Sequence, residues 1–276
     1  MDIRLQLVFL WIAVAFYAGA SSLFIGSLVF NKSNLTKLSV IITVVGFVSH
    51  SVSLILRWIQ VGHGPYMTFY EVTSSDAWVA ILVYLLFQVR FRNMRFLGAI
   101  IIPVSFLLIG LGVMSSTKVE SIPQTFKTFW LFVHIFFGKL TYGLALLGFG
   151  MAVVYLLRHY FPVRGERFFS KLPDNNQLDD ASYRMFSFAF LVIGIMIAAG
   201  SIWANQAWGR YWGWDPVETW SLISWMLIGL YLHLRIVHGW RGVRAAWVLV
   251  TVFLVIVFAI FGVVYFYHSI HSEYLK

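Results

Sequence analysis

The sequence contains no cysteine, so it forms no disulfide and performs no thiol chemistry with its own side chains. Charged residues are also scarce: they make up 11% of the 276 residues, whereas 60% are hydrophobic. This balance excludes a soluble domain of this size. The alternation expected of a membrane β-barrel is absent as well. We therefore expect a helical membrane protein, and any thiols in its reaction must come from another molecule.

About eight apolar runs approach the roughly 20 residues that a transmembrane helix needs. The predicted fold class is an all-α integral membrane protein, a bundle of about eight transmembrane helices forming one domain over residues 1–276. The polar segment 158–184 is expected to be a cytoplasmic linker. The spans are expected at about residues 5–30, 38–59, 77–89, 96–114, 130–157, 185–204, 216–238 and 245–267.

The formal charge of +9 comes mostly from short loops between these spans. Positively charged loops face the cytoplasm, so topology explains the charge and no nucleic-acid partner is expected. This orientation places both termini on the outer side, periplasmic or luminal. The positive loops are Asn31–Lys37, Arg90–Arg95, Arg158–Arg184 and Arg235–Arg244.

Tryptophan is concentrated in one segment: six of the twelve lie between Trp203 and Trp225. Tryptophans that flank a span usually anchor it at the membrane–water interface, and this explains Trp203 and Trp225. Trp208, Trp212 and Trp214 are instead interleaved with glycines, which permit close approach of a ligand. A shelf of indole rings suits a large, flat, apolar ligand. We expect a Trp-rich loop over residues 205–220 on the outer face.

Two carboxylates follow the tryptophans. Asp215, Pro216 and Glu218 have the spacing of a capping box with proline at the first helical position. These residues are therefore interpreted first as the start of a helix. Asp215 and Glu218 could also shape the floor of a ligand site.

The run W-G-x-x-W-x-W-D-P-x-E-T-W, from Trp208 to Trp220, resembles the WWD signature of the haem-handling proteins of cytochrome c biogenesis. Within that group the chain is similar to the CcsA (ResC) family of System II. An earlier loop resembles the family pattern G-H-x-P-x-x-N-x-Y-E-S at Gly62, His63, Pro65, Tyr70 and Glu71. It departs from that pattern at Thr68 and Val72, where the pattern has Asn and Ser.

Two histidines are expected at the outer face. His134 lies near the start of the fifth predicted span and His271 near the C-terminus. Neutral imidazoles bind haem iron axially, and ligands from distant helices can approach opposite faces of one iron. Position alone leaves ligand and structural roles equally plausible. The resemblance implies that both residues ligate haem iron beside the Trp-rich loop.

His233 lies within the seventh predicted span, where an ionisable residue is usually functional. The resemblance implies that it is a haem ligand at membrane depth. His50 also lies within a span, but its depth is roughly 15 Å against roughly 25 Å for His233, at 1.5 Å per residue. Axial ligands must be nearly level, so the second ligand of His233 is expected from a partner chain. His50 is then a relay or, by preference, a packed core histidine.

Four more residues are weaker candidates for the site. His63, between two glycines, could cover the edge of the haem or contact an incoming protein. Arg57, Lys139 and Arg210 could hold the haem propionates, because cations at an interface stabilise carboxylates. Snorkelling towards the headgroups explains Arg57 and Lys139 equally well.

The resemblance implies the activity and the partners. CcsA-like proteins act with CcsB (ResB) as a cytochrome c synthase, so haem lyase activity is expected only together with that partner. Haem b is the transported ligand, and its vinyl groups are joined to the thiols of a C-x-x-C-H motif in apocytochrome c. A thioredoxin-like reductant of those thiols is a further expected partner. The expected location is a bacterial inner membrane or a thylakoid-type membrane, with the functional face periplasmic or luminal.

Three alternatives remain open at this point. A CcmC-like protein shares the signature but passes haem to a chaperone. An electron-transfer subunit would hold two permanent b-type haems through histidine pairs about four turns apart, as His50 and His63 are, but glycine and proline interrupt the helix between them. A transporter without a cofactor leaves the tryptophans and outer histidines unexplained.

Overall fold

The computed structural model describes residues 3–115, 117, 124–161 and 172–267, and every regular element in these ranges is a helix. Eight helical stretches are long and apolar enough to cross a membrane, so the predicted fold class is confirmed. The chain packs as two compact units, which are described separately below. The placement of both termini on the outer side stays a prediction.

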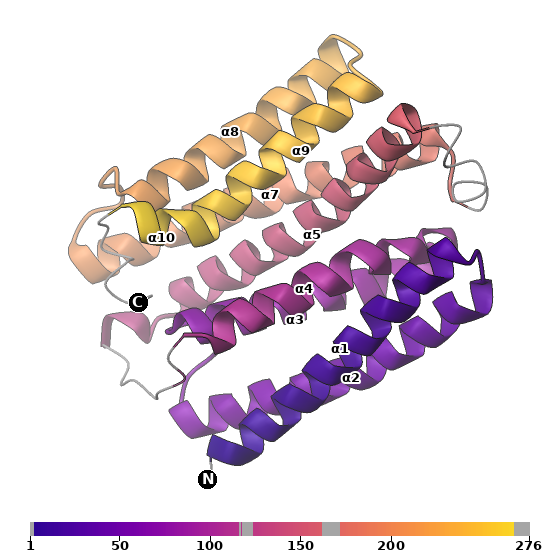
Figure 1. Ribbon diagram of the computed structural model, residues 1–276. Helices are drawn as coiled ribbons and strands as arrows, with labels where there is room; N and C mark the ends of the chain where they lie inside the picture. The colour runs from indigo at the N-terminus through magenta and orange to yellow at the C-terminus, as the bar shows by residue number, and fades with distance from the viewer. Residues whose placement is uncertain (1–2, 116, 118–123, 162–171, 268–276) are drawn as a thin grey trace. The chain divides into compact units, whose positions relative to one another are not determined.

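The first unit comprises the described parts of residues 1–121 and 161–173 (Figure 1). Its helix α1 lies along α2, and α4 contacts both α3 and α1. Gly98 permits this approach, because a Cβ there would collide with Phe24 of α1 and Tyr84 of α3. The elements are α1 (Ile3–Val29), α2 (Ser33–Val61), α3 (Phe69–Arg90), the 3-10 turn η1 (Arg92–Leu97) and α4 (Gly98–Val113).

The second unit comprises the described parts of residues 122–160 and 174–276. Helices α5 and α7 pack along each other, and α9 lies against α5 and α8. Gly148 of α5 lets Phe186 of α7 approach, because a Cβ would lie 2.6 Å from its ring. The elements are η2 (Gln124–Phe126), α5 (Phe129–Tyr160), α7 (Asn175–Trp208), α8 (Pro216–Val237), α9 (Val243–Val257), the π-helical turn η3 (Phe258–Gly262) and α10 (Val263–Phe266).

Two helices begin earlier than hydropathy predicts. Helix α7 starts at Asn175, where the Asp174 side chain caps it by accepting from the Gln177 N–H at 2.8 Å. The last part of segment 158–184, expected to be a linker, is therefore helical. Helix α3 starts at Phe69 rather than near residue 77. Helix α7 begins with Asn-Asn-Gln, and α3 carries polar side chains at Glu71 and at residues 73–76 before its apolar run. Hydropathy does not detect such polar helical turns.

The last span contains a change of helix type. In η3 the Phe258 carbonyl accepts a hydrogen bond from the Val263 N–H five residues later. Such π turns hold one residue more than an α turn and often occur at functional sites. The Phe258 ring meets Trp220 of α8 edge to face, with centroids 4.7 Å apart. The turn is thus packed against the helix that follows the Trp-rich loop.

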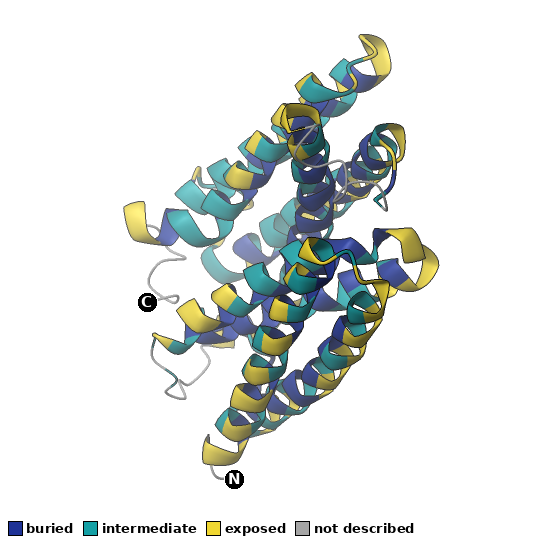
Figure 2. Cartoon of the chain, turned by 45° about the vertical axis from the view of Figure 1, so that its right-hand side comes forward, coloured by how far each residue is buried: buried dark blue, intermediate teal, exposed yellow. Residues whose placement is uncertain are grey.

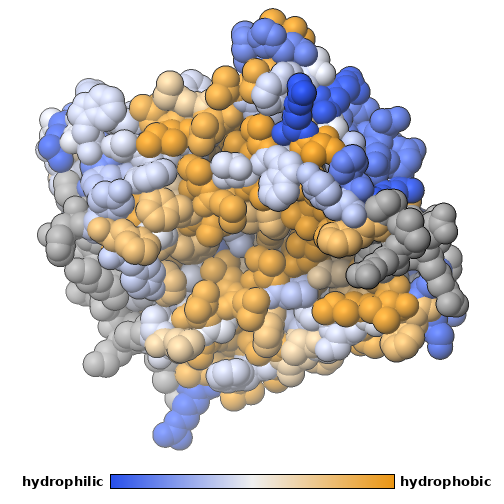
Figure 3. Space-filling view, turned by 45° about the horizontal axis from the view of Figure 1, so that its top comes forward, coloured by the Kyte–Doolittle hydropathy of each residue, from blue (hydrophilic) through white to orange (hydrophobic). Residues whose placement is uncertain are grey.

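Apolar side chains cover much of the outward surface of the helices. Exposed positions run along the outward faces and the ends of the helices (Figure 2). Hydrophobic residues dominate the face drawn in Figure 3, and hydrophilic residues gather at its edges. Lipid tails suit such a surface, and the chain is an integral membrane protein. Exposed apolar residues include Val48, Leu107, Leu191, Met226 and Leu254.

The first unit buries an ion pair where α2 ends and α3 begins. Arg57 Nε lies 2.8 Å from Glu71 Oε1, and each side chain is only 1% exposed. Glu71 Oε2 accepts from the Met67 N–H at 2.9 Å, and Thr68 Oγ1 accepts from the Glu71 N–H at 3.2 Å. Thr68 is therefore the N-cap of α3. Asparagine, the residue of the family pattern at this position, is also a preferred N-cap, and it ranks above threonine.

We predict that Glu71→Gln destabilises the protein much more than Asp180→Asn. The first change removes the carboxylate charge that faces the buried Arg57 guanidinium, and breaking a buried ion pair costs about 3–5 kcal/mol. Asp180 pairs with Arg235 and Arg241 but is 49% exposed, and such pairs contribute about 1 kcal/mol or less. Thermal unfolding of both variants in detergent measures the difference. Equal melting temperatures would contradict the importance of the buried pair.

Candidate functional site

The Trp-rich loop is shorter than predicted. Helix α7 continues to Trp208 and ends at Gly209, whose φ of 73° is left-handed. Helix α8 begins at Pro216, so only residues 209–215 are non-helical. The glycine is required here because its left-handed conformation is unfavourable for residues with a Cβ.

The predicted capping box of α8 is confirmed. The Asp215 side chain accepts from the Val217 N–H at 2.9 Å. Glu218 Oε2 accepts from the Asp215 N–H at 3.1 Å and from the Gly213 N–H at 2.8 Å. One carboxylate thus holds the backbone on both sides of Trp214.

Trp214 has an unfavourable backbone conformation. Its φ is 57°, in the left-handed region, which costs a non-glycine residue about 1–3 kcal/mol. Its side chain is 70% exposed and meets Trp212 edge to face, with centroids 5.8 Å apart. Because the ring is exposed, packing does not offset this strain; the Glu218 hydrogen bonds to residues 213 and 215 hold the backbone on both sides of Trp214.

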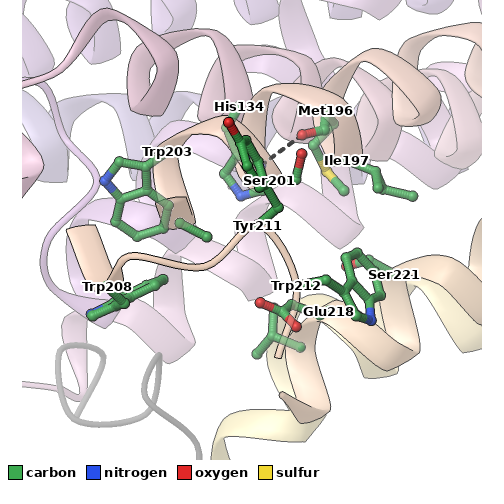
Figure 4. A pocket seen from close by; sticks show the side chains of 13 residues that line it. His134, Met196, Ile197, Ser201, Trp203, Trp208, Tyr211, Trp212, Glu218 and Ser221 are labelled. Atoms are coloured by element: carbon green, nitrogen blue, oxygen red, sulfur yellow. Dashed lines mark hydrogen bonds between the residues drawn. The ribbon is translucent and has the colours of Figure 1, made fainter. Parts of the chain in front are cut away.

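A pocket lies beside this loop, entirely within the second unit (Figure 4). Its walls come from α5, α7, the loop and the first turns of α8, and they include the aromatic side chains of Trp203, Trp208, Tyr211 and Trp212. Trp212 Nε1 is buried without a hydrogen-bond partner among the described residues. An unsatisfied buried donor is rare in proteins, and a carboxylate or another acceptor on a ligand would satisfy it. The remaining lining residues are His134, Met196, Ile197, Gly200, Ser201, Ala204, Val217, Glu218 and Ser221.

His134 is held in one orientation by α7. Its Nδ1 lies 2.9 Å from the Met196 carbonyl, which only accepts, so Nδ1 carries the proton. In the neutral ring Nε2 then has the lone pair. Histidines that ligate metals are commonly oriented in this way. Gly200 makes room for the ring, because a Cβ there would lie 2.5 Å from His134 Nδ1.

Sequence reasoning missed part of this site. Trp203, expected to be an interfacial anchor, is 3% exposed and lines the pocket. Its ring lies 6.2 Å from that of His134 at 29°, and its Nε1 donates to the Thr125 carbonyl at 2.9 Å. Trp208 follows five positions later on the same helix, and the two rings meet with centroids 4.8 Å apart. The absence of a helix-breaking residue between them was the signal that both belong to α7. Tyr211 was not predicted either.

The structure brings His134, Trp208, Trp212 and Glu218 together, and it places the other loop candidates outside the pocket lining. Trp214 and Asp215 belong to the same loop. The exposed Arg210 lies close to Gly213, where a Cβ would meet its guanidinium at 2.5 Å. Lys139 lies farther along α5 and does not line the pocket either. His271 is outside the described residues, so its position relative to His134 stays a prediction.

His233 lies near the far end of α8, fifteen residues after Glu218 and therefore roughly 22 Å away along the helix. Its side chain is exposed on the surface of the described chain. The ring of His238, also exposed, lies 5.6 Å from it edge to face. His233 therefore does not belong to the pocket.

The candidates of the first unit are all partly or fully buried by their own neighbours. His50 is completely buried, with Tyr17 Oη 3.3 Å from Nδ1 and Ser74 Oγ 3.0 Å from Nε2. Both ring nitrogens are engaged, as expected of a packed core histidine. The Arg57 charge is neutralised by Glu71, so the side chain does not snorkel.

His63 is 5% exposed, and its Nδ1 donates to the Gly64 carbonyl at 2.7 Å. Its Nε2 has no hydrogen-bond partner among the described residues. The Tyr66 ring lies 5.6 Å away, and burial, assisted by the Glu71 carboxylate, raises the pKa of Tyr66. Because so little of His63 is exposed, direct contact with an incoming protein would require this loop to open.

The sequence of this chain matches a known protein family. Residues 66–271 match the family model described as cytochrome C assembly protein. Among curated relatives named cytochrome c biogenesis protein CcsA, that of Chlamydomonas reinhardtii is 32% identical over 79% of this chain and 63% of its own length, so the chain spans less than two thirds of it. That of Guillardia theta is 30% identical over 83% of both chains, and that of Prochlorococcus marinus strain NATL2A is 32% identical over 79% of both.

A solved structure named Cytochrome c Heme Lyase CcmF has the same fold with a TM-score of 0.73. The similarity covers 94% of this chain and 46% of that one, with 15% sequence identity. At that identity the likeness concerns the fold alone.

We predict that Trp214→Gly is more stable than Trp214→Ala by about 1 kcal/mol. Both variants remove the exposed ring, but only glycine adopts a φ of 57° without strain. Thermal unfolding of the two purified variants measures the difference. A glycine variant no more stable than the alanine variant would show that the backbone here is not strained.

Proposed function

This chain belongs to the cytochrome c assembly protein family, and from that premise we propose that it holds haem in the pocket beside residues 209–215 and presents it for attachment to apocytochrome c. The observation that carries the proposal is His134, whose proton is held on Nδ1 by the Met196 carbonyl at 2.9 Å within a pocket of aromatic rings. With the proton on Nδ1, Nε2 carries the lone pair that we propose ligates iron.

Each residue of the site has a proposed role that follows from its side-chain chemistry. Trp208 and Trp212 provide flat apolar surface for the porphyrin, and Trp203 packs beside the His134 ring. Glu218 keeps the loop rigid through its two backbone hydrogen bonds. Trp214, Asp215, Arg210 and Lys139 remain candidates for contacts at the edge of the ligand. His271 is the proposed second axial ligand.

Attachment joins each haem vinyl group to a thiol of the C-x-x-C-H motif of the substrate. The thiol S–H adds across the vinyl double bond, with sulfur going to one carbon and hydrogen to the other, so no oxidant is consumed. The protein's own contribution is orientation, which is a large part of catalysis when two groups must meet in one geometry. The histidine of the substrate motif would then replace one axial histidine and so promote release of the product.

Two further partners are proposed, one from the absence of cysteine and the other from the exposed position of His233. Because the chain has no thiol, reduced thiols on the substrate need an external, thioredoxin-like reductant. The exposed position of His233 on α8 supports a second iron ligand from a CcsB-like membrane partner. We place the attachment site on the periplasmic or luminal side of a bacterial inner membrane or a thylakoid-type membrane.

We predict that His134→Ala lowers haem occupancy and cytochrome c maturation by at least tenfold, because it removes the proposed iron ligand. His159→Ala is the matched control, since it lies at the opposite end of the same helix. Haem content of the purified complex and thioether-linked haem on a C-x-x-C-H substrate are the two readouts. Normal values of both in the His134 variant would reject the proposed site. Transfer of haem by the unaltered complex to an acceptor without any thioether product would indicate delivery to a chaperone instead.

We also predict that Gly200→Ala lowers haem occupancy about 10- to 100-fold, as expected when the support of a metal ligand is disturbed. Its Cβ would displace His134 by meeting Nδ1 at 2.5 Å. Gly194→Ala on the same helix is the control, since its Cβ would lie 3.3 Å from Trp225 Nε1, where a small shift suffices. Equal haem content in the two variants would contradict the positioning of His134 by α7.

For His233, we predict that haem bound there shows a six-coordinate, bis-histidine spectrum only when the membrane partner is present. Absorption spectra of the chain purified with and without the partner test this. His238→Ala serves as the control, because the His238 ring is the nearest other imidazole described. A bis-histidine spectrum at this site without the partner, abolished by His238→Ala, would assign the second ligand to this chain.

A further inference from the structure

A cluster of positive charge lies at one end of the first unit and takes no part in the site above. Helix α1 ends there at Val29, α2 begins at Ser33 and α3 ends at Arg90. Residues 27–37 and 88–98 contain no Asp or Glu. They contain five cations, namely Lys32, Lys37, Arg90, Arg92 and Arg95.

Three of these cations surround a cavity of about 210 Å³, here called the basic cavity. Lys37, Arg92 and Arg95 line it, together with the polar side chains of Ser33 and Asn93. None of its described lining residues is a carboxylate. The other lining residues are Ser27, Leu28, Asn31, Thr36, Phe96 and Leu172.

The cations are arranged for an external anion. Arg95 Nε donates to Gln88 Oε1 at 3.0 Å, which orients its guanidinium without neutralising it. Lys37 and Arg92 form no ion pair within the described part of the chain. Three like charges around one cavity repel each other, and a bound anion removes that repulsion. Guanidinium, ammonium, hydroxyl and amide donors together match the oxygens of a phosphate group.

The surroundings of the basic cavity favour a lipid as the source of that phosphate. The cavity lies where three spans end, which is the level of the headgroups in a bilayer. Apolar side chains next to its lining residues face outward: Val29, Phe30 and Val89 are each at least 66% exposed. Acyl chains would cover such residues, whereas free phosphate would leave them bare. Basic pockets between spans bind anionic headgroups in membrane proteins.

We propose that the basic cavity binds the phosphodiester headgroup of an anionic phospholipid. This proposal is independent of haem binding, since it concerns only residues of the first unit. Its consequence is selectivity: the protein retains an anionic lipid in preference to a zwitterionic one that has the same acyl chains.

Native mass spectrometry of the full chain released from nanodiscs tests the proposal. With equal amounts of phosphatidylglycerol and phosphatidylcholine in the nanodisc, we expect retained phosphatidylglycerol to exceed phosphatidylcholine about tenfold. Replacing Lys37→Gln together with Arg92→Gln should reduce that excess about tenfold, because two charge-assisted contacts are lost. Lys32→Gln together with Arg90→Gln removes the same charge from residues that do not line the cavity, and this control should behave like the unaltered chain.

Several outcomes would overturn the proposal. Equal retention of the two lipids by the unaltered chain would do so without any variant. An equal loss in the control would mean diffuse attraction to the membrane rather than a site. Displacement of the lipid by excess inorganic phosphate, or phosphate binding in nanodiscs made only of phosphatidylcholine, would assign the cavity to the free ion. If the glutamine variant does not fold, Lys37→Arg with Arg92→Lys should keep the selectivity, and its loss there would reject a site defined by charge.

Discussion

The candidate site depends on one hydrogen bond between two helices. His134 of α5 donates from Nδ1 to the Met196 carbonyl of α7, and this contact sets both the tautomer and the direction of the ring. A carbonyl inside a helix normally accepts from the residue four positions later, and it has a second lone pair for this purpose. Close packing of α5 on α7, with glycine at position 200, brings the two groups within reach. The His134 Nε2, which we propose ligates iron, is therefore oriented by helix packing rather than by a flexible loop.

The loop beside His134 is rigid for a different reason. In a low-dielectric site, an unpaired carboxylate or N–H group is costly, and here Glu218 pairs with the backbone of residues 213 and 215. The same carboxylate belongs to the capping box of α8, so the start of the helix and the shape of the loop are stabilised together. A left-handed Trp214 persists because the residues on both sides of it are held.

Much of this could be predicted from the sequence, because the relevant signals are local. Eight apolar runs gave the spans, and Asp215, Pro216 and Glu218 gave the start of α8. What could not be predicted depends on partners far apart in the chain. The Trp203 indole is buried because it meets Thr125, 78 residues earlier, and His50 is satisfied by residues of two other helices. Hydropathy likewise missed the first two turns of α7, where the buried Asp179 pairs with Arg235 and accepts from the Gly242 N–H.

The π-helical turn η3 has a consequence for how the last span is aligned with its relatives. A turn closed from Phe258 to Val263 accommodates one additional residue, so every later position is rotated by about 100° from where uninterrupted α periodicity would put it. A homologue lacking that residue would need a one-residue gap at this turn for its C-terminal side chains to superimpose. Ungapped alignment would compare residues on different sides of the helix, and an apparent loss of similarity beyond Gly262 would then reflect helical phase rather than divergence of the residues themselves.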